Sequence, residues 1–107
     1  MQHMTAPELA QLLQDPSQPQ PLLLDVREAW EFDICHIAGA QLMPMNAVPA
    51  RYPELNRELP IVCICHHGGR SMQVAHFLER NGFSRVINLT GGVHAWAQQV
   101  DASMPTY

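Results

Sequence analysis

The chain has 107 residues, of which 47% are hydrophobic, so we expect residues 1–107 to form a single domain with one core. The formal net charge is −4, and the six basic residues are all arginine and form no cluster, which excludes the basic patch typical of a nucleic-acid-binding protein. The longest apolar runs are far shorter than the roughly 20 residues that cross a membrane, so no membrane association is expected.

The first half of the chain predicts one clear helix and one buried strand. Thr5-Ala6-Pro7-Glu8 has the spacing of a capping box, and leucines then recur at helical intervals, which predicts a helix over about residues 6–14. The proline-rich stretch 15–21 indicates a loop within the domain. The continuous apolar run 22–26 is typical of a strand buried on both faces of a parallel sheet.

Shorter elements follow in the middle of the chain. Residues 28–32 predict one helical turn, and residues 40–43 predict a further strand. The next segment contains prolines at intervals that allow only short helical pieces, namely Pro44, Pro49, Pro53 and Pro60.

The second half alternates strands and helices. Residues 61–65 and 83–89 are apolar and predict strands, whereas 71–80 and 93–100 carry an apolar helical face. Alternation of this kind predicts an α/β fold, in which a parallel sheet has helices on both faces.

The most informative stretch is Cys65-His66-His67-Gly68-Gly69-Arg70-Ser71, which presents a cysteine between a strand and a helix. Adjacent glycines let consecutive backbone N–H groups converge on one anionic centre, and the following helix adds the positive end of its dipole. Because the thiolate is the nucleophilic form of cysteine, this loop predicts a reactive Cys65. Arg70 offers a planar fork suited to an oxyanion substrate.

These residues and several other motifs in the same order resemble the single-domain rhodaneses. The resemblance runs from about Thr5 to Trp96. Besides the Cys65 loop, it rests on Asp25-Val26-Arg27-Glu28, Glu31-Phe32, His36-Ile37-Ala38-Gly39-Ala40, Gly82-Phe83 and Leu89-Thr90-Gly91-Gly92 with Trp96.

The resemblance implies a rhodanese-like three-layer fold with a central five-stranded parallel sheet. It also implies a thiosulfate-type sulfurtransferase without a cofactor, in which Cys65 carries sulfur as a persulfide in a ping-pong reaction. The donor would be a thiosulfate-like molecule. The acceptor would be cyanide, a thiol or a sulfur-accepting protein.

The roles of individual residues follow from the same resemblance. Cys65 is the expected nucleophile, the amides of residues 66–70 (His66, His67, Gly68, Gly69 and Arg70) hold the persulfide, and Arg70 closes the loop. Asp25, Arg27 and Ser71 are expected to support the loop. Cys35 stands where the family usually has glycine and Ala38 where it commonly has proline, so the turn before His36 departs from the pattern.

Two other functions deserve comparison. A cysteine phosphatase uses a similar loop, but only four residues separate Cys65 from Arg70, one fewer than in phosphatases, and the smaller cradle favours a single sulfur atom. A non-catalytic regulatory module of the same fold usually lacks the cysteine, which this chain retains. Both remain alternatives to the sulfurtransferase.

The remaining cysteines and histidines are not expected to form a metal site. A zinc site of Cys63, Cys65, His66 and His67 is not expected, because the chain would have to double back to bring them together. Cys63 is predicted to be a buried strand residue and Cys35 a half-buried turn residue, with any redox role left open. His67 is expected to point to solvent, whereas the role of His66 stays open.

The cell compartment is predicted from cysteine usage. Three cysteines leave one unpaired in any intramolecular scheme, and the first residues show no charged and apolar secretion signal. These features favour a reducing cytoplasm.

Overall fold

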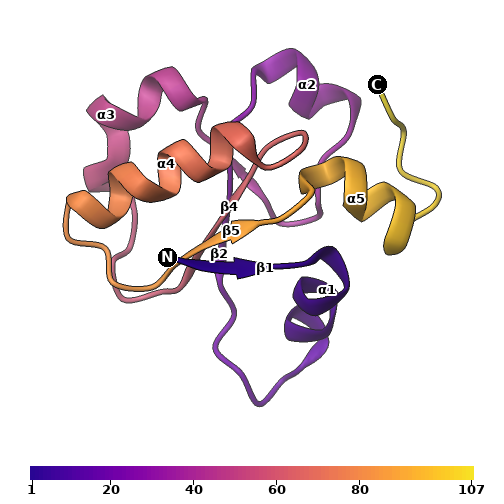
Figure 1. The fold of residues 1–107 in the computed structure, drawn as a ribbon, viewed down its shortest axis with the longest axis horizontal. Coiled ribbons are helices and arrows are strands. Elements are labelled where there is room, and N and C mark those ends of the chain that lie inside the picture. The colour runs from indigo at the N-terminus through magenta and orange to yellow at the C-terminus, as the bar shows by residue number, and fades with distance from the viewer.

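The computed structural model describes all 107 residues and contains one five-stranded parallel sheet of order β1-β5-β4-β2-β3 (Figure 1). This confirms the predicted α/β fold with five parallel strands. In the register, Asp25 lies beside Ile64, so β2 and β4 end level with each other. The strands are β1 (Gln2–Met4), β2 (Leu22–Asp25), β3 (Gln41–Leu42), β4 (Ile61–Ile64) and β5 (Val86–Leu89).

Four α-helices connect the strands, a fifth follows β5, and two short 3-10 turns flank α3 at Met45–Ala47 and Tyr52–Glu54. The helices are α1 (Ala6–Gln14), α2 (Ala29–Ile34), α3 (Val48–Arg51), α4 (Gly69–Arg80) and α5 (Gly92–Gln99). The first helix begins as the capping box predicts. The Glu8 carboxylate accepts from the Thr5 backbone N–H at 2.9 Å, and the Thr5 hydroxyl accepts from the Glu8 N–H at 3.3 Å.

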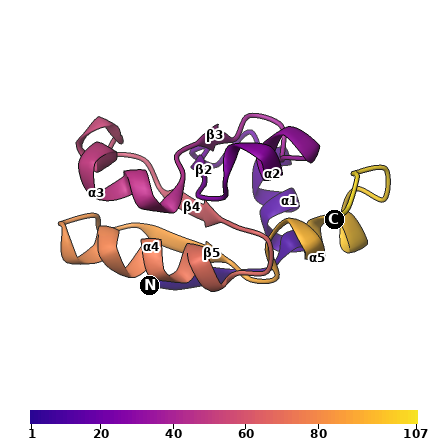
Figure 2. The same cartoon turned by 90° about the horizontal axis from the view of Figure 1, so that it is seen from above.

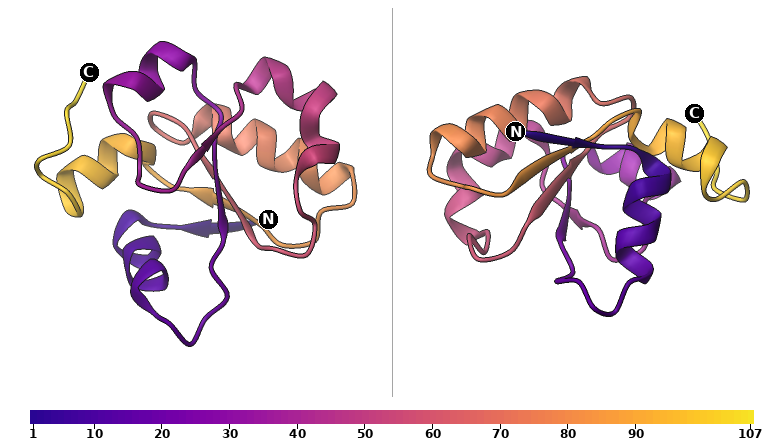
Figure 3. Two further views of the ribbon diagram at one scale, coloured as in Figure 1. Left: turned by 180° about the vertical axis from the view of Figure 1, so that it is seen from behind. Right: turned by 60° about the horizontal axis from the view of Figure 1, so that its bottom comes forward.

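The sheet is buried on both faces by separate apolar clusters. Helices α3 and α4 cover one face, where 13 buried residues include Val48, Val74 and Leu78. Helices α1 and α5 cover the other, where 11 buried residues include Leu9 and Trp96. The two pairs of helices lie on opposite sides of the strands in Figures 2 and 3. Since neighbouring strand residues point to opposite faces, β2 and β4 contribute to both clusters.

Three details differ from the sequence-based expectations. Strand β1 was not predicted, because Gln2-His3-Met4 is too short and polar to show a strand pattern. Helix α4 begins at Gly69 rather than at residue 71, so Arg70 and Ser71 belong to its first turn. Cys35 is buried rather than half-buried, with 7% of its surface exposed. None of the helices has the length and hydropathy needed to cross a membrane.

Candidate active site

Cys65 follows the last residue of β4 at the carboxyl edge of the sheet, and its side chain is only 2% exposed. The carboxyl edge of an open parallel sheet is where ligands usually bind. The loop between β4 and α4 lies between α2 and the start of α5 (Figure 1). The sequence-predicted nucleophile therefore occupies the position that the fold offers to a substrate.

The sulfur of Cys65 has two hydrogen-bonding neighbours. The backbone N–H of Gly68 donates to Sγ at 3.1 Å, and the hydroxyl of Ser71 lies 3.3 Å from Sγ. Gly68 has φ of +113°, a conformation that side chains rarely adopt, and it directly precedes α4. A backbone N–H and the first turn of α4 therefore both adjoin the sulfur.

A buried amide that the sequence analysis did not identify supports this arrangement. Asn88 in β5 is 2% exposed; its Oδ1 accepts from the Ser71 hydroxyl at 2.5 Å, and its Nδ2 donates to the Gly68 carbonyl at 3.3 Å. Asn88 therefore links residues 65–68, the loop that carries the predicted nucleophile (the nucleophile loop), to the neighbouring strand β5. The sequence does carry a sign of this role, because Asn88 is a single polar residue inside an otherwise apolar strand. A buried polar side chain of this kind needs a hydrogen-bonding partner.

Asp25 and Arg27 form a buried ion pair beside the loop, and both side chains are 0% exposed. Arg27 donates from Nη2 to Asp25 at 2.7 Å and to the Cys35 carbonyl at 2.7 Å. Burial alone would lower the pKa of Arg27, but its hydrogen bonds to Asp25 and Tyr107 raise it. The guanidinium is thus fully used inside the protein. Cys35 itself has φ of −161°, ordinary extended backbone, so its replacement of the family's usual glycine causes no strain.

The fork of Arg70 is occupied by a carboxylate. Its Nη1 and Nη2 donate to Oε1 and Oε2 of Glu31 at 2.7 and 2.9 Å, and Glu31 is 4% exposed. The hydrogen bond from Arg70 is the main reason that the pKa of Glu31 falls to about 2. A carboxylate 39 residues away in the sequence therefore already pairs with the guanidinium that the sequence analysis offered to an oxyanion substrate. The sequence analysis noted Glu31 only as part of a motif.

Tyr107, in the segment after α5, contacts both Glu31 and Arg27. Its hydroxyl donates to Glu31 Oε2 at 2.7 Å and accepts from Arg27 Nη1 at 2.9 Å. Its ring stacks on His66 with centroids 4.1 Å apart and meets the edge of Trp30, which is 60% exposed. Burial raises the pKa of Tyr107 to about 12, so its hydroxyl is neutral. Figure 3 shows the segment after α5 reaching towards α2. No local sequence pattern indicated this contact.

The two loop histidines differ in exposure. His67 is exposed, whereas His66 is half-buried beside Tyr107, and burial lowers its pKa. Both rings lie close to His94 of α5, which the sequence analysis did not single out. The set that the sequence analysis weighed for zinc used Cys63 and Cys65, and it differs from this group of three histidines.

Cys63 points into the core and is 0% exposed. Burial raises the pKa of its thiol to about 12, so the thiol stays protonated and unreactive at neutral pH. The predicted role as a small buried hydrophobe agrees with these properties.

Comparison with known proteins identifies the family. Residues 5–99 match the model of the rhodanese-like domain. The chain belongs to the rhodanese-like family. A sulfurtransferase from Allochromatium vinosum is 38% identical over 77 residues, which cover 72% of each protein. A solved rhodanese-like domain protein from Staphylococcus aureus superposes with a TM-score of 0.82 at 34% identity, covering 90% of this chain and 91% of that one.

Other rhodanese-like relatives are longer. The rhodanese-like/PpiC domain-containing protein 12 of Arabidopsis thaliana is 40% identical over 105 residues, and the putative sulfur carrier protein YrkF of Bacillus subtilis is 38% identical over 79 residues. The chain spans only 35% and 43% of those two proteins. Together, the sulfurtransferase and sulfur-carrier relatives support a general role in sulfur transfer.

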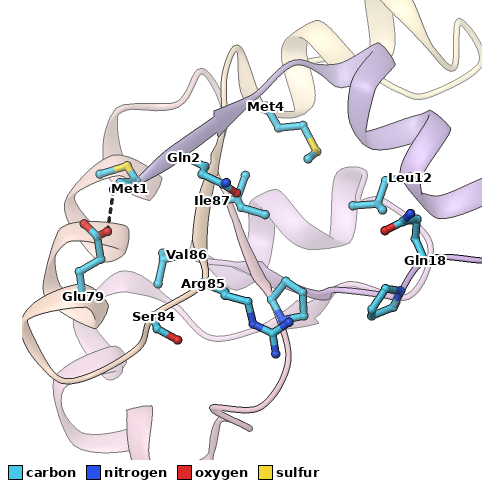
Figure 4. A pocket seen from close by; sticks show the side chains of 12 residues that line it. Met1, Gln2, Met4, Leu12, Gln18, Glu79, Ser84, Arg85, Val86 and Ile87 are labelled. Carbon is cyan, nitrogen blue, oxygen red and sulfur yellow. Dashed lines mark ion pairs between the residues drawn. The ribbon is translucent and has the colours of Figure 1, made fainter.

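A separate hollow lies at the opposite edge of the sheet, near the amino ends of β1 and β5 (Figure 4). Met1, Glu79 and Arg85 line it, and the amino group of Met1 pairs with Glu79 at 2.7 Å. It contains no cysteine or histidine. This hollow therefore plays no part in the arrangement around Cys65.

Proposed function

We propose that the chain is a sulfurtransferase that carries sulfane sulfur as a persulfide on Cys65. The observation that carries the proposal is the Gly68 amide, which donates to Sγ at 3.1 Å directly before the N-terminus of α4. A donor at this place stabilises the Sγ thiolate before it is loaded and again when sulfur transfer regenerates it. The sulfurtransferase and sulfur-carrier relatives support the same reaction class.

The reaction has two half-reactions in which atoms and charges balance. The Cys65 thiolate attacks the outer sulfur of thiosulfate, and a bond forms between Sγ and this outer sulfur. The bond between the outer and inner sulfurs of thiosulfate breaks, and sulfite leaves with its electron pair. The outer sulfur of the persulfide is then attacked by cyanide or by a thiolate. The thiolate of Cys65 is regenerated, and thiocyanate or a new persulfide leaves.

The charges around the site bear on the choice of donor. Arg27 is paired with Asp25, and Arg70 is paired with Glu31. Both cations are thus neutralised, so charge attraction contributes little to binding a doubly charged donor. We infer that thiosulfate serves as a workable donor in assays and that a thiol or a sulfur-accepting protein suits the site as acceptor.

Intact-mass measurement after exposure to thiosulfate tests this function. The wild-type chain is expected to gain the mass of one sulfur atom and to lose it again when cyanide is added. Cys65→Ser should gain nothing, because a hydroxyl is a poorer nucleophile and cannot form a persulfide. Cys63→Ala is the matched control and should still load sulfur, since the Cys63 thiol is buried and protonated.

The same experiment separates the alternatives. A chain that never loads sulfur from thiosulfate or from a small persulfide would be a non-catalytic module of this family. If Cys65→Ser still gains a sulfur atom, a residue other than Cys65 is the nucleophile. Hydrolysis of aryl phosphates through Cys65 would instead favour the phosphatase.

A further inference from the structure

Three histidine rings meet at the rim of the candidate site. The ligand nitrogens of His66, His67 and His94 all lie within 4.8 Å of one another. Ring centroids are 4.1 Å apart for His66 and His67 and 4.9 Å apart for His67 and His94. The proposed sulfur transfer uses the backbone of the loop and gives these three rings no role.

Backbone hydrogen bonds fix the two elements that carry the rings. The N–H of Val93 donates to the Cys65 carbonyl at 3.0 Å, and the N–H of His94 donates to the His66 carbonyl at 3.1 Å. A Cβ atom on Gly92 would lie 2.3 Å from the Cys65 carbonyl oxygen, so the loop and α5 are in close contact. The positions from which the three side chains start are therefore set by the fold, which lowers the entropy cost of binding a ligand between them.

The ring nitrogens of this cluster are free of protein partners. Among the other histidines, His36 bonds to the Phe32 carbonyl at 2.8 Å and His76 lies 3.9 Å from Glu79. No hydrogen bond or ion pair of this kind engages the rings of His66, His67 and His94, of which His67 is exposed and the other two are half-buried. Their nitrogens are available to an outside ligand.

The spacing suits a metal ion after small side-chain movements. Zinc binds imidazole nitrogen at about 2.0–2.1 Å, which places the nitrogens of a tetrahedral site about 3.3 Å apart. Nitrogens that already lie within 4.8 Å of one another would have to approach by at most about 1.5 Å, a movement on the scale of side-chain rotation. Three imidazoles with a fourth position open are a known type of zinc coordination, and imidazole suits divalent zinc, copper and nickel.

We propose that His66, His67 and His94 bind one divalent transition-metal ion of the zinc type, with a fourth coordination position open to solvent. Two of the ligands directly follow Cys65 in the loop, and the third comes from α5, so the ion would tie these two elements together. This site is distinct from the sulfur chemistry, because it uses side chains that the proposed transfer does not need.

Zinc titration by calorimetry tests the site. The experiment uses Cys65→Ser protein, so that the thiolate cannot bind zinc and sulfur transfer plays no part in the result. We expect one zinc ion per chain. Adding His94→Ala should weaken binding at least about tenfold, because a ligand is lost. The matched control is His76→Ala, which removes an exposed histidine of α4 and should leave zinc binding unchanged.

A second measurement guards against misfolding of the variants. His67→Ala removes an exposed side chain, and it should weaken zinc binding while the circular dichroism and melting temperature of the zinc-free protein stay unchanged. In the parent protein, NMR signals of the three rings should shift together when zinc is added. Equal affinity in the His94→Ala and His76→Ala proteins, or no zinc binding by the parent, would overturn the proposal.

Discussion

The two hydrogen-bonding neighbours of the Cys65 sulfur act differently. The Ser71 hydroxyl has one proton, and in this structure that proton is directed to Asn88. Ser71 therefore offers an acceptor to the Cys65 thiol, whereas the Gly68 amide always offers a donor. An anionic sulfur consequently depends more on the backbone amide and on the dipole of α4 than on the serine.

Substitution of Glu31 should change how the site treats an anionic donor. Glu31→Gln removes the charge that neutralises Arg70 while keeping an oxygen that accepts a hydrogen bond. We expect the KM for thiosulfate to fall by about fivefold, equivalent to about 1 kcal/mol, at low salt. The gain should shrink at high ionic strength, where charges are screened. Steady-state kinetics at two salt concentrations measure this effect.

Glu54→Gln is the matched control for that prediction. Glu54 forms a similar but exposed pair with Arg51 at 3.2 Å, on a turn next to α3. Its substitution should leave the KM for thiosulfate unchanged. If both variants behave like the wild type, Arg70 does not contribute to donor binding even when its charge is released.

At the residue scale, what the sequence could predict depended on distance along the chain. Cys65, Gly68 and Ser71 lie in one contiguous motif, so their proximity follows from local structure. The pair of Arg70 and Glu31 is separated by 39 residues, and the contact of Tyr107 with Glu31 by 76. Only the packing of the whole chain creates such contacts, which is why the sequence analysis left Arg70 unpaired.

At the element scale, α5 acts as a clamp on the nucleophile loop. Its first N–H groups are not used within the helix, as at every helix N-terminus, and two of them donate to the carbonyls of Cys65 and His66. The hydrogen bonds between this helix and the loop thus use backbone groups alone. Close contact is possible because Gly92, the first residue of α5, has no side chain.

Gly92→Ala should separate the loop from α5. The new Cβ would lie 2.3 Å from the Cys65 carbonyl oxygen and 2.5 Å from that of His66, and φ at this position is +57°. Because both contacts are with backbone, we expect the free energy of unfolding to fall by at least about 2 kcal/mol. For a domain of this size, the melting temperature should fall by roughly 8 °C or more. Thermal unfolding measured by circular dichroism checks this.

Gly69→Ala, at the first residue of α4, is the matched control. A Cβ at Gly69 meets nothing within 4 Å. Its substitution should change the free energy of unfolding by less than about 1 kcal/mol. An equal loss in both variants would mean that the steric contact at Gly92 is not the cause.

Among the elements, the sequence predicted those with strong local signals. The capping box placed the start of α1 at Ala6, and the apolar run placed the start of β2 at Leu22, both as observed. The start of α4 was misplaced because glycines normally interrupt helices, whereas here Gly69 continues from the left-handed Gly68. Strand β1 forms only because β5 offers it an open edge.

At the scale of the whole molecule, a polar network closes the carboxyl edge of the sheet between the two apolar clusters. Through Asp25, Glu31, Arg70 and Tyr107, it joins β2, α2, α4 and the segment after α5. Arg27 connects its two halves, since it donates both to Asp25 and to Tyr107. The fold class was predictable because alternating apolar runs determine it, whereas this network depends on tertiary contacts between distant residues.

The network makes the stability of the fold sensitive to acid. The pKa of Glu31 is about 2 in the folded chain, mainly because of Arg70, against 4.5 as its ordinary value. The folded state therefore binds fewer protons than the unfolded state between these values, and stability falls as pH decreases through this window. We expect Glu31 to account for a loss on the order of 2–3 kcal/mol between about pH 5 and pH 2. Urea unfolding at several pH values measures the loss.

In Glu31→Gln the decline in stability with falling pH should be shallower by this amount, whereas Glu54→Gln, with its exposed pair, should follow the wild-type curve. Parallel curves for wild type and Glu31→Gln would show that Arg70 and Tyr107 hold this carboxylate no more tightly in the folded chain than water does in the unfolded one.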